Sequence, residues 1–173
     1  MSAADAYLLL IILQIGISLA TIGIVYRIGT HLWGSAPAFL AAFLLSLDLA
    51  STVNALQILT DTLFTCVLTL AVWMGLRALS CSQKAMPWIF FHGLCLTIAT
   101  LIRPIAYYLI VPELLFWLLV WIKWWHWSWK TTLVALLTLL TPWIMLIGGW
   151  HVRNYLTAGT LEFSSIQAVN LLF

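Results

Sequence analysis

Residues 7–26 read YLLLIILQIGISLATIGIVY and contain no charged side chain. About 20 apolar residues, each rising about 1.5 Å along an α-helix, cross the roughly 30 Å hydrocarbon layer of a bilayer. The stretch therefore predicts a membrane-spanning helix. Barrel strands are disfavoured, because the run shows no alternation with a period of two and because a helix pairs its own backbone groups within lipid.

Five further apolar stretches predict an all-α, polytopic transmembrane helix bundle of about six spanning helices. We assign the bundle to residues 1–150 and an outer-face interfacial segment, mixed in polarity, to residues 151–173. Pro112 and Pro142 fall inside apolar stretches and predict kinks. The stretches cover residues 35–55, 59–79, 88–102 (short for a span), 105–122 and 131–150.

The composition of the chain excludes several classes of protein. Of its 173 residues 64% are hydrophobic and 7% are charged, with a formal net charge of +2. A soluble domain carries roughly 25% charged and about 45–50% apolar residues. A soluble enzyme, a disordered chain and a nucleic-acid binder are thus ruled out, and no nucleic-acid partner is expected. The three Cys and four His lack ligand spacing, so we expect neither a metal site nor a cofactor.

The basic residues indicate the orientation of the spans. If the first span starts outside, five of the seven basic residues fall on one side, which the positive-inside rule makes cytoplasmic. Arg103 and Arg153 remain on the outer side. We expect a multi-pass protein of a bacterial inner or plasma membrane with its site facing outside. The five cytoplasmic residues are Arg27, Arg77, Lys84, Lys123 and Lys130.

Six tryptophans between residues 117 and 129 surround Lys123 and Lys130. Because tryptophan gathers at the level of lipid headgroups, they predict an aromatic belt at the inner interface. Stacking of a sugar or a base on these rings is the alternative.

Charged groups at the outer ends of the spans are the candidate site residues. Arginine offers a fork of donors that suits phosphate, and carboxylates suit proton abstraction. Plainer interpretations stay open: Asp61 as the first residue of a helix, Asp48 as an interface acid, and Arg103 as a group that binds the last carbonyls of a helix.

Two further positions have alternative interpretations. His151 and Arg153 could be interface anchors. Glu113 lies near the middle of a span, where it is either protonated or paired with a group such as Tyr107, Tyr108 or His92.

Short motifs in a consistent order resemble the GT-C-type integral membrane glycosyltransferases. More narrowly, they are similar to the protein-mannosyltransferase and aminoarabinose-transferase-like group. The resemblance covers about residues 15–173. The motifs are VYRIG at 25–29 with LWG at 32–34 and AP at 36–37, LTDTLF at 59–64, LIRP at 101–104, TPW at 141–143, RNY at 153–155, Gly159 and the Ser164–Ser165 pair.

This resemblance implies transfer of a sugar from a polyprenyl-phosphate carrier to a lipid, glycan or protein acceptor at the outer membrane face. Asp61 matches an acidic segment and becomes the catalytic candidate. Arg103 and the Arg153–Asn154 pair match basic segments that bind the carrier phosphate; Asp48 and His151 are further site candidates. The first span and first outer loop of the family, with its acidic pair, have no counterpart, so the chain resembles an interior piece.

Two other functions compete with the transferase. A transporter or flippase subunit would use Glu113 beside Pro112, and a non-catalytic membrane scaffold would show no clustering of charged residues.

Overall fold

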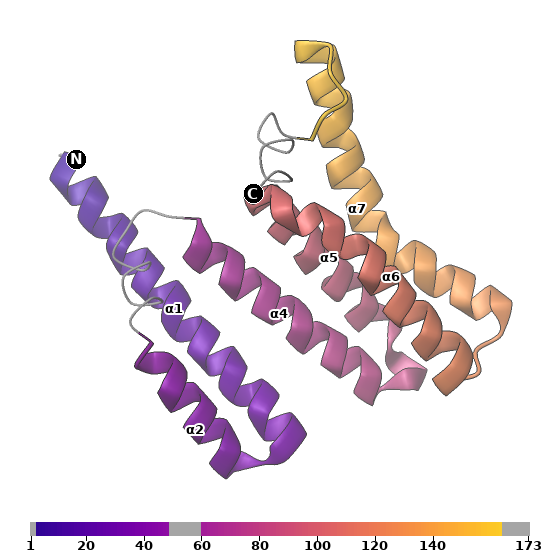
Figure 1. Ribbon diagram of the computed structural model, residues 1–173, viewed down its shortest axis with the longest axis horizontal. Helices are drawn as coiled ribbons and strands as arrows, with labels where there is room; N and C mark the ends of the chain where they lie inside the picture. The colour runs from indigo at the N-terminus through magenta and orange to yellow at the C-terminus, as the bar shows by residue number, and fades with distance from the viewer. Residues whose placement is uncertain (1–2, 49–59, 164–173) are drawn as a thin grey trace. The chain divides into compact units, whose positions relative to one another are not determined.

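The computed structural model describes residues 3–48 and 60–163, which fold into helices with no strand among them. The all-α prediction is therefore confirmed. The chain divides into two compact units, Met1–Leu76 (unit 1) and Arg77–Phe173 (unit 2). The α-helices, labelled as in Figure 1, are α1 (Ala3–Trp33), α2 (Ser35–Ser46), α4 (Asp61–Ser80), α5 (Met86–Ile102), α6 (Ile110–Leu119) and α7 (Trp129–Ala158).

Four helical stretches are long and apolar enough to cross a membrane: Asp5–Trp33, Asp61–Ser80, Pro104–Trp124 and Trp129–Ala158. The protein is thus an integral, multi-pass membrane protein. The other two apolar helices are shorter: α2 has 12 residues and α5 has 17, which correspond to about 18 Å and about 26 Å of rise. The predicted span at 35–55 is helical only as far as Ser46, and its last residues lie outside the described part.

In unit 1, α1 and α2 form an antiparallel hairpin (Figure 1). The chain turns at Gly34, whose φ of 88° is a conformation that glycine adopts without steric cost. Behind the turn the two helices approach closely: a Cβ atom at Gly29 would lie 2.8 Å from the Cα of Ala38. The hairpin therefore requires glycine at both positions.

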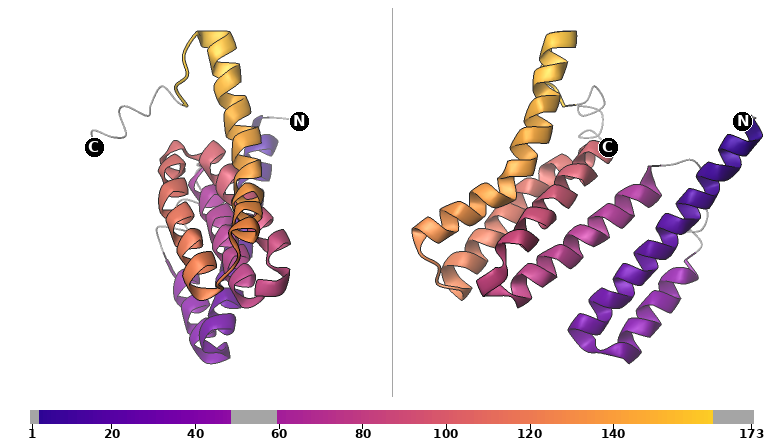
Figure 2. Two further views of the ribbon diagram at one scale, coloured as in Figure 1. Left: turned by 90° about the vertical axis from the view of Figure 1, so that its right-hand side faces the viewer. Right: turned by 180° about the vertical axis from the view of Figure 1, so that it is seen from behind.

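In unit 2, α5, α6 and α7 lie side by side (Figures 1 and 2). The central helix is α5, which buries most residues between Ile89 and Thr100. Gly93 allows α7 to approach, because a Cβ atom there would fall on the backbone carbonyl of Leu139.

The core of unit 2 corrects the prediction of an aromatic belt. Trp117 and Trp121 are 1% and 0% exposed and belong to the core cluster with Ile89 and Leu139, whereas Trp124 and Trp129 are 70% and 72% exposed. The belt prediction is wrong for the first pair, since residues four apart share one helix face and here face the core.

A π-helical turn at Val120–Trp124 moves Trp124 off the core face, where a regular α-helix would place it seven residues after Trp117. The Trp125 N–H donates to the Val120 carbonyl at 2.9 Å, which widens the turn by one residue. Trp125 thereby packs against the core, and Trp124 points away from it.

The two prolines predicted to cause kinks behave differently. Pro142 lies within α7, which bends near its middle (Figure 1), as expected when a proline removes a backbone donor. Pro112 instead lies in the first turn of α6, after a 3₁₀ segment at Pro104–Leu109, where its missing N–H costs little. α7 runs on to Ala158, so the boundary drawn at residues 150/151 falls within a helix.

Candidate functional site

The two acidic candidates belong to unit 1. Asp48 follows α2, is exposed, and its N–H donates to the Leu45 carbonyl at 3.2 Å. Asp61 is half-buried and is the first residue of α4. An acidic group is favoured there because unpaired N–H groups give the start of a helix a partial positive charge. The interpretation of Asp61 as a helix-start residue is confirmed.

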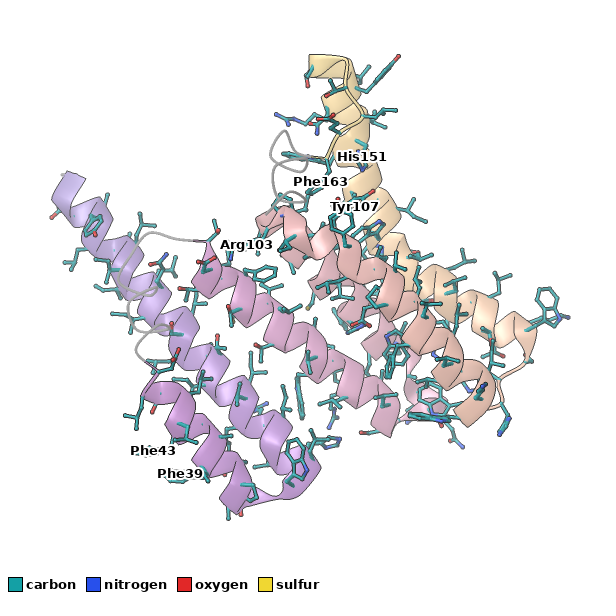
Figure 3. The ribbon with its side chains drawn as sticks, viewed as in Figure 1. Phe39, Phe43, Arg103, Tyr107, His151 and Phe163 are labelled. Carbon is teal, nitrogen blue, oxygen red and sulfur yellow. The ribbon has the colours of Figure 1, made fainter. Side chains whose placement is uncertain are left out.

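Arg103 lies at a break in unit 2, between α5 and the 3₁₀ segment (Figure 3). Its backbone is extended, with φ −137° and ψ 119°, because a following proline disfavours the helical conformation. The Arg103 N–H still closes α5 by donating to the Ala99 carbonyl at 2.9 Å. The break leaves the Arg103 residue exposed at the end of α5.

Tyr107, four residues after Arg103, connects this break to α7. Its ring centroid lies 5.5 Å from that of Trp143, 6.0 Å from that of His151 and 5.4 Å from that of Phe163. Figure 3 shows Tyr107, His151 and Phe163 close together. We call the five rings of Tyr107, Trp143, Trp150, His151 and Phe163 the Tyr107 cluster.

The chain reverses after α7 and runs back along it. Gly159 ends the helix with a φ of 69°, and its N–H donates to the Tyr155 carbonyl at 3.0 Å. Residues 160–163, the return segment, are then held by their carbonyls. Trp150 Nε1–H donates to Phe163 at 3.0 Å, His151 Nδ1–H to Leu161 at 2.7 Å and Asn154 Nδ2–H to Glu162 at 3.0 Å.

Arg153 lies on the outside of this arrangement. The centre of its guanidinium is 4.8 Å from the centroid of the Trp150 ring, a distance at which a cation is attracted to an aromatic face. One guanidinium nitrogen donates to Asn154 Oδ1 at 3.5 Å. The Asn154 amide therefore links Arg153 to the return segment.

The structure brings the two basic candidates to the same end of unit 2. Arg103 precedes Tyr107 by one turn, Arg153 follows His151 by two residues, and the rings of Tyr107 and His151 are in contact. Asp48 and Asp61 belong to unit 1.

Sequence reasoning did not assign Tyr107, Trp150 and Phe163 to the site, although they hold the basic segments. The available signal was Gly159, a typical helix-ending residue, preceded by Trp150, His151 and Asn154 on neighbouring turns. Nothing in the sequence indicates that these side chains bind backbone carbonyls that follow the glycine.

Glu113 has a partner within unit 2. Its Oε2 lies 3.1 Å from Nε2 of His92, whose side chain is buried and whose ring also meets Trp117 edge-on. Of the partners considered from the sequence, His92 makes this contact. Polar groups at membrane depth normally pair in this way, so the strongest sequence feature in favour of transport has a structural explanation.

Among the described residues, no group of three or more His, Cys, Asp or Glu is placed to hold a metal ion. Cys66 and Cys81 are half-buried, and Cys95 is buried. The candidate residues thus offer carboxylate, imidazole, amide and guanidinium groups.

Residues 5–147 match the family model of the dolichyl-phosphate-mannose-protein mannosyltransferases. The matched region covers well over half of the 173 residues. The chain belongs to this family. No curated protein and no solved structure matches this mannosyltransferase-family chain.

The protein is therefore a member of a GT-C-type glycosyltransferase family, as the sequence motifs indicated. Asp48, Asp61 and Arg103 lie within the matched residues of the mannosyltransferase model, whereas His151 and the Arg153–Asn154 pair follow them. The family implies a lipid-linked sugar donor and an acceptor in a membrane.

Proposed function

We propose that this mannosyltransferase-family chain, as an enzyme or as part of one, transfers a sugar from a polyprenyl-phosphate carrier to an acceptor at the outer membrane face. The acceptor is a lipid, a glycan or a protein. Its hydroxyl oxygen forms the new bond to the anomeric carbon, and the bond from that carbon to the carrier phosphate oxygen breaks. The polyprenyl phosphate leaves with the bonding electrons, and a carboxylate takes the hydroxyl proton.

Arg103 and Arg153 bind the carrier phosphate in this proposal. A guanidinium donates two parallel hydrogen bonds to a phosphate and keeps its charge at any physiological pH. The observation that carries the assignment is the contact between Tyr107 and His151, which places both arginine segments at one end of unit 2. Asn154 supports Arg153 through its Oδ1 atom.

Asp61 is the proposed proton acceptor. A carboxylate can act as a general base when a hydroxyl comes within hydrogen-bonding reach. This role is supported by the resemblance of LTDTLF at 59–64 to an acidic segment of the family, with Asp61 at the first turn of α4. Asp48 is a second acid, and His151 contributes by holding the return segment.

The charge distribution supports an outward-facing site. Within unit 2, Lys84 lies in the turn before α5, Lys123 in the π-helical turn after α6 and Lys130 in the first turn of α7. These segments lie at the end of the unit away from the Tyr107 cluster (Figures 1 and 2). The positive-inside rule assigns that end to the cytoplasm, and Arg103 and Arg153 to the outer side.

The test measures binding of dolichyl phosphate mannose to the full chain in phosphatidylcholine nanodiscs. Arg103→Ala and Arg153→Ala should each weaken binding by about 10-fold or more, since a hydrogen bond to a charged group contributes about 1.5–3 kcal/mol. Arg27→Ala is the control, because Arg27 is also exposed but belongs to unit 1. Unchanged binding in both variants would contradict the proposal.

A second measurement separates binding from chemistry. Asp61→Asn should lower transfer to an acceptor by about 100-fold, within the range for loss of a general base, and leave donor binding unchanged. The matched control is Glu162→Gln, an exposed acid whose backbone carbonyl, not its carboxylate, accepts the bond from Asn154. Full turnover in Asp61→Asn would remove this residue from the reaction.

A further inference from the structure

The end of unit 2 opposite the Tyr107 cluster exposes three lysines and two tryptophans. Lys84 ends a short 3₁₀ turn after α4, Lys123 lies in the π-helical turn, and Lys130 lies in the first turn of α7. We call Lys84, Lys123, Trp124, Trp129 and Lys130, all exposed, the Lys–Trp surface.

The packing of the core brings these residues to one end of the unit. Ala85, next to Lys84, and Trp121, two residues before Lys123, belong to the same buried cluster. Ala135, from the second turn of α7, belongs to it as well. The turn before α5 and the turn before α7 also lie at the same end in Figures 1 and 2.

Contacts between tryptophan rings beneath the Lys–Trp surface fix the connection from α6 to α7, which carries most of the residues of that surface. The ring centroids of Trp121 and Trp127 are 6.3 Å apart with planes inclined by 9°, and those of Trp125 and Trp127 are 4.7 Å apart. The Trp127 N–H donates to the Trp121 carbonyl at 2.9 Å. These contacts hold the rings of Trp121, Trp125 and Trp127 together, while Trp124 and Trp129 are exposed beside Lys123 and Lys130.

The surface carries positive charge with no neighbouring acid. Residues 77–90 and 120–135 contain no Asp or Glu. The acids of unit 2 lie elsewhere: Glu113 contacts His92, and Glu162 belongs to the return segment at the other end. None of the three lysines has an ion pair or a hydrogen bond from its side chain within residues 3–48 and 60–163.

From this arrangement we infer that the Lys–Trp surface binds the headgroups of anionic phospholipids. A lysine ammonium attracts a lipid phosphate as a point charge, and clusters of basic residues at the membrane surface select acidic lipids. Indole rings prefer the same depth, where their apolar faces meet the acyl chains and their N–H groups meet the headgroups. The inference is independent of the proposed transfer reaction.

The test compares the lipids retained by the full chain from vesicles of phosphatidylcholine with phosphatidylglycerol, read by mass spectrometry of the intact complex. The triple variant Lys84→Gln, Lys123→Gln, Lys130→Gln should bind phosphatidylglycerol about 100-fold more weakly, since each lysine is expected to contribute about fivefold. Arg27→Gln, which removes an exposed cation of unit 1, should change binding less than about twofold.

A triple Lys→Arg variant serves as the conservative control and should retain phosphatidylglycerol, because it keeps the charges. If the Gln variant does not fold, raised salt applied to the unaltered chain should release phosphatidylglycerol and spare phosphatidylcholine. Undiminished retention of phosphatidylglycerol in the Gln variant, or an equal loss in Arg27→Gln, would overturn the inference.

Discussion

The two ends of unit 2 use their aromatic side chains in different ways. At the Tyr107 cluster, the indole N–H of Trp150 donates a hydrogen bond to the carbonyl of Phe163, and the rings hold the return segment against α7. At the other end, Trp117 and Trp121 are fully buried, and neither indole N–H has a hydrogen-bond partner in the described part of the chain. One end is fixed by polar contacts, and the other by the volume of its side chains.

This difference determines what each end tolerates. A buried core loses contacts on all sides when a large side chain is shortened, because the cavity refills only in part. In a chain reversal held by hydrogen bonds, one substitution removes about one hydrogen bond, and hydrogen bonds to water replace part of the lost free energy. Substitutions at the tryptophan core should therefore act on the whole unit, and substitutions at the Tyr107 cluster should act locally.

The largest effect is expected for Trp121→Ala. The side chain is 0% exposed, and removal of a buried tryptophan costs about 3–5 kcal/mol. Unfolding in mixed detergent micelles measures the loss. Trp124→Ala, whose ring is 70% exposed, is the matched control and should cost less than about 0.5 kcal/mol. Equal losses in the two variants would remove the distinction between buried and exposed rings.

Gly93→Ala should disturb both ends at once. An added Cβ would meet the Leu139 carbonyl and push α7 away from α5, at a cost of about 1–3 kcal/mol for overpacking. The same unfolding measurement applies. At Gly148 an added Cβ would meet no atom within 4 Å, so Gly148→Ala should leave stability unchanged or slightly raised. A neutral Gly93→Ala variant would show that the two helices need not approach so closely.

Asn154→Ala should act on the return segment alone. It removes the N–H donated to the Glu162 carbonyl and the acceptor for Arg153, at a cost of about 1 kcal/mol. Amide hydrogen exchange should become faster at residues 160–163 and stay unchanged in α5. Thr157→Ala provides a control, since its hydroxyl contacts only the Arg153 carbonyl within the helix. Faster exchange throughout unit 2 would contradict a local role.

The smallest effect is expected for Tyr107→Phe. The Tyr107 hydroxyl has no hydrogen-bond partner within residues 3–48 and 60–163, and the ring makes the contacts. The substitution should change the free energy of unfolding by less than about 0.5 kcal/mol. Tyr107→Leu should cost about 1 kcal/mol, since an aromatic pair contributes about 0.5–1.5 kcal/mol beyond its buried area. A hydroxyl role would appear as equal losses in both variants.

Much of the fold could be predicted because lipid restricts the options. The apolar run at 7–26 could only be a spanning helix, and Pro142 inside another apolar run predicted the bend of α7. The burial of Trp117 but not Trp124 could not be read from spacing, since a π-helical turn changes the register between them. Val120 and Trp121 of that turn are buried with Ile89 of α5 and Leu139 of α7, contacts that the local sequence does not specify.

The candidate site was predictable to a similar extent. Arg103 before Pro104 indicated a break in the helix, and the structure has the break there. The bonds from Trp150, His151 and Asn154 were not predictable, because their partners are backbone carbonyls that any residue carries. Charge patterning predicted which residues lie at the ends of the spans, and the structure shows which contacts hold the segments of Arg103 and Arg153.

The bend in α7 makes its second half a lever. From Pro142 to Arg153 the helix rises about 16 Å, so a change of about 10° in the bend would carry the guanidinium nearly 3 Å sideways. The Tyr107 ring contacts the ring of Trp143 just after the bend and the ring of His151 farther along the second half of α7. The tyrosine ring is thus placed to limit the swing of the arm.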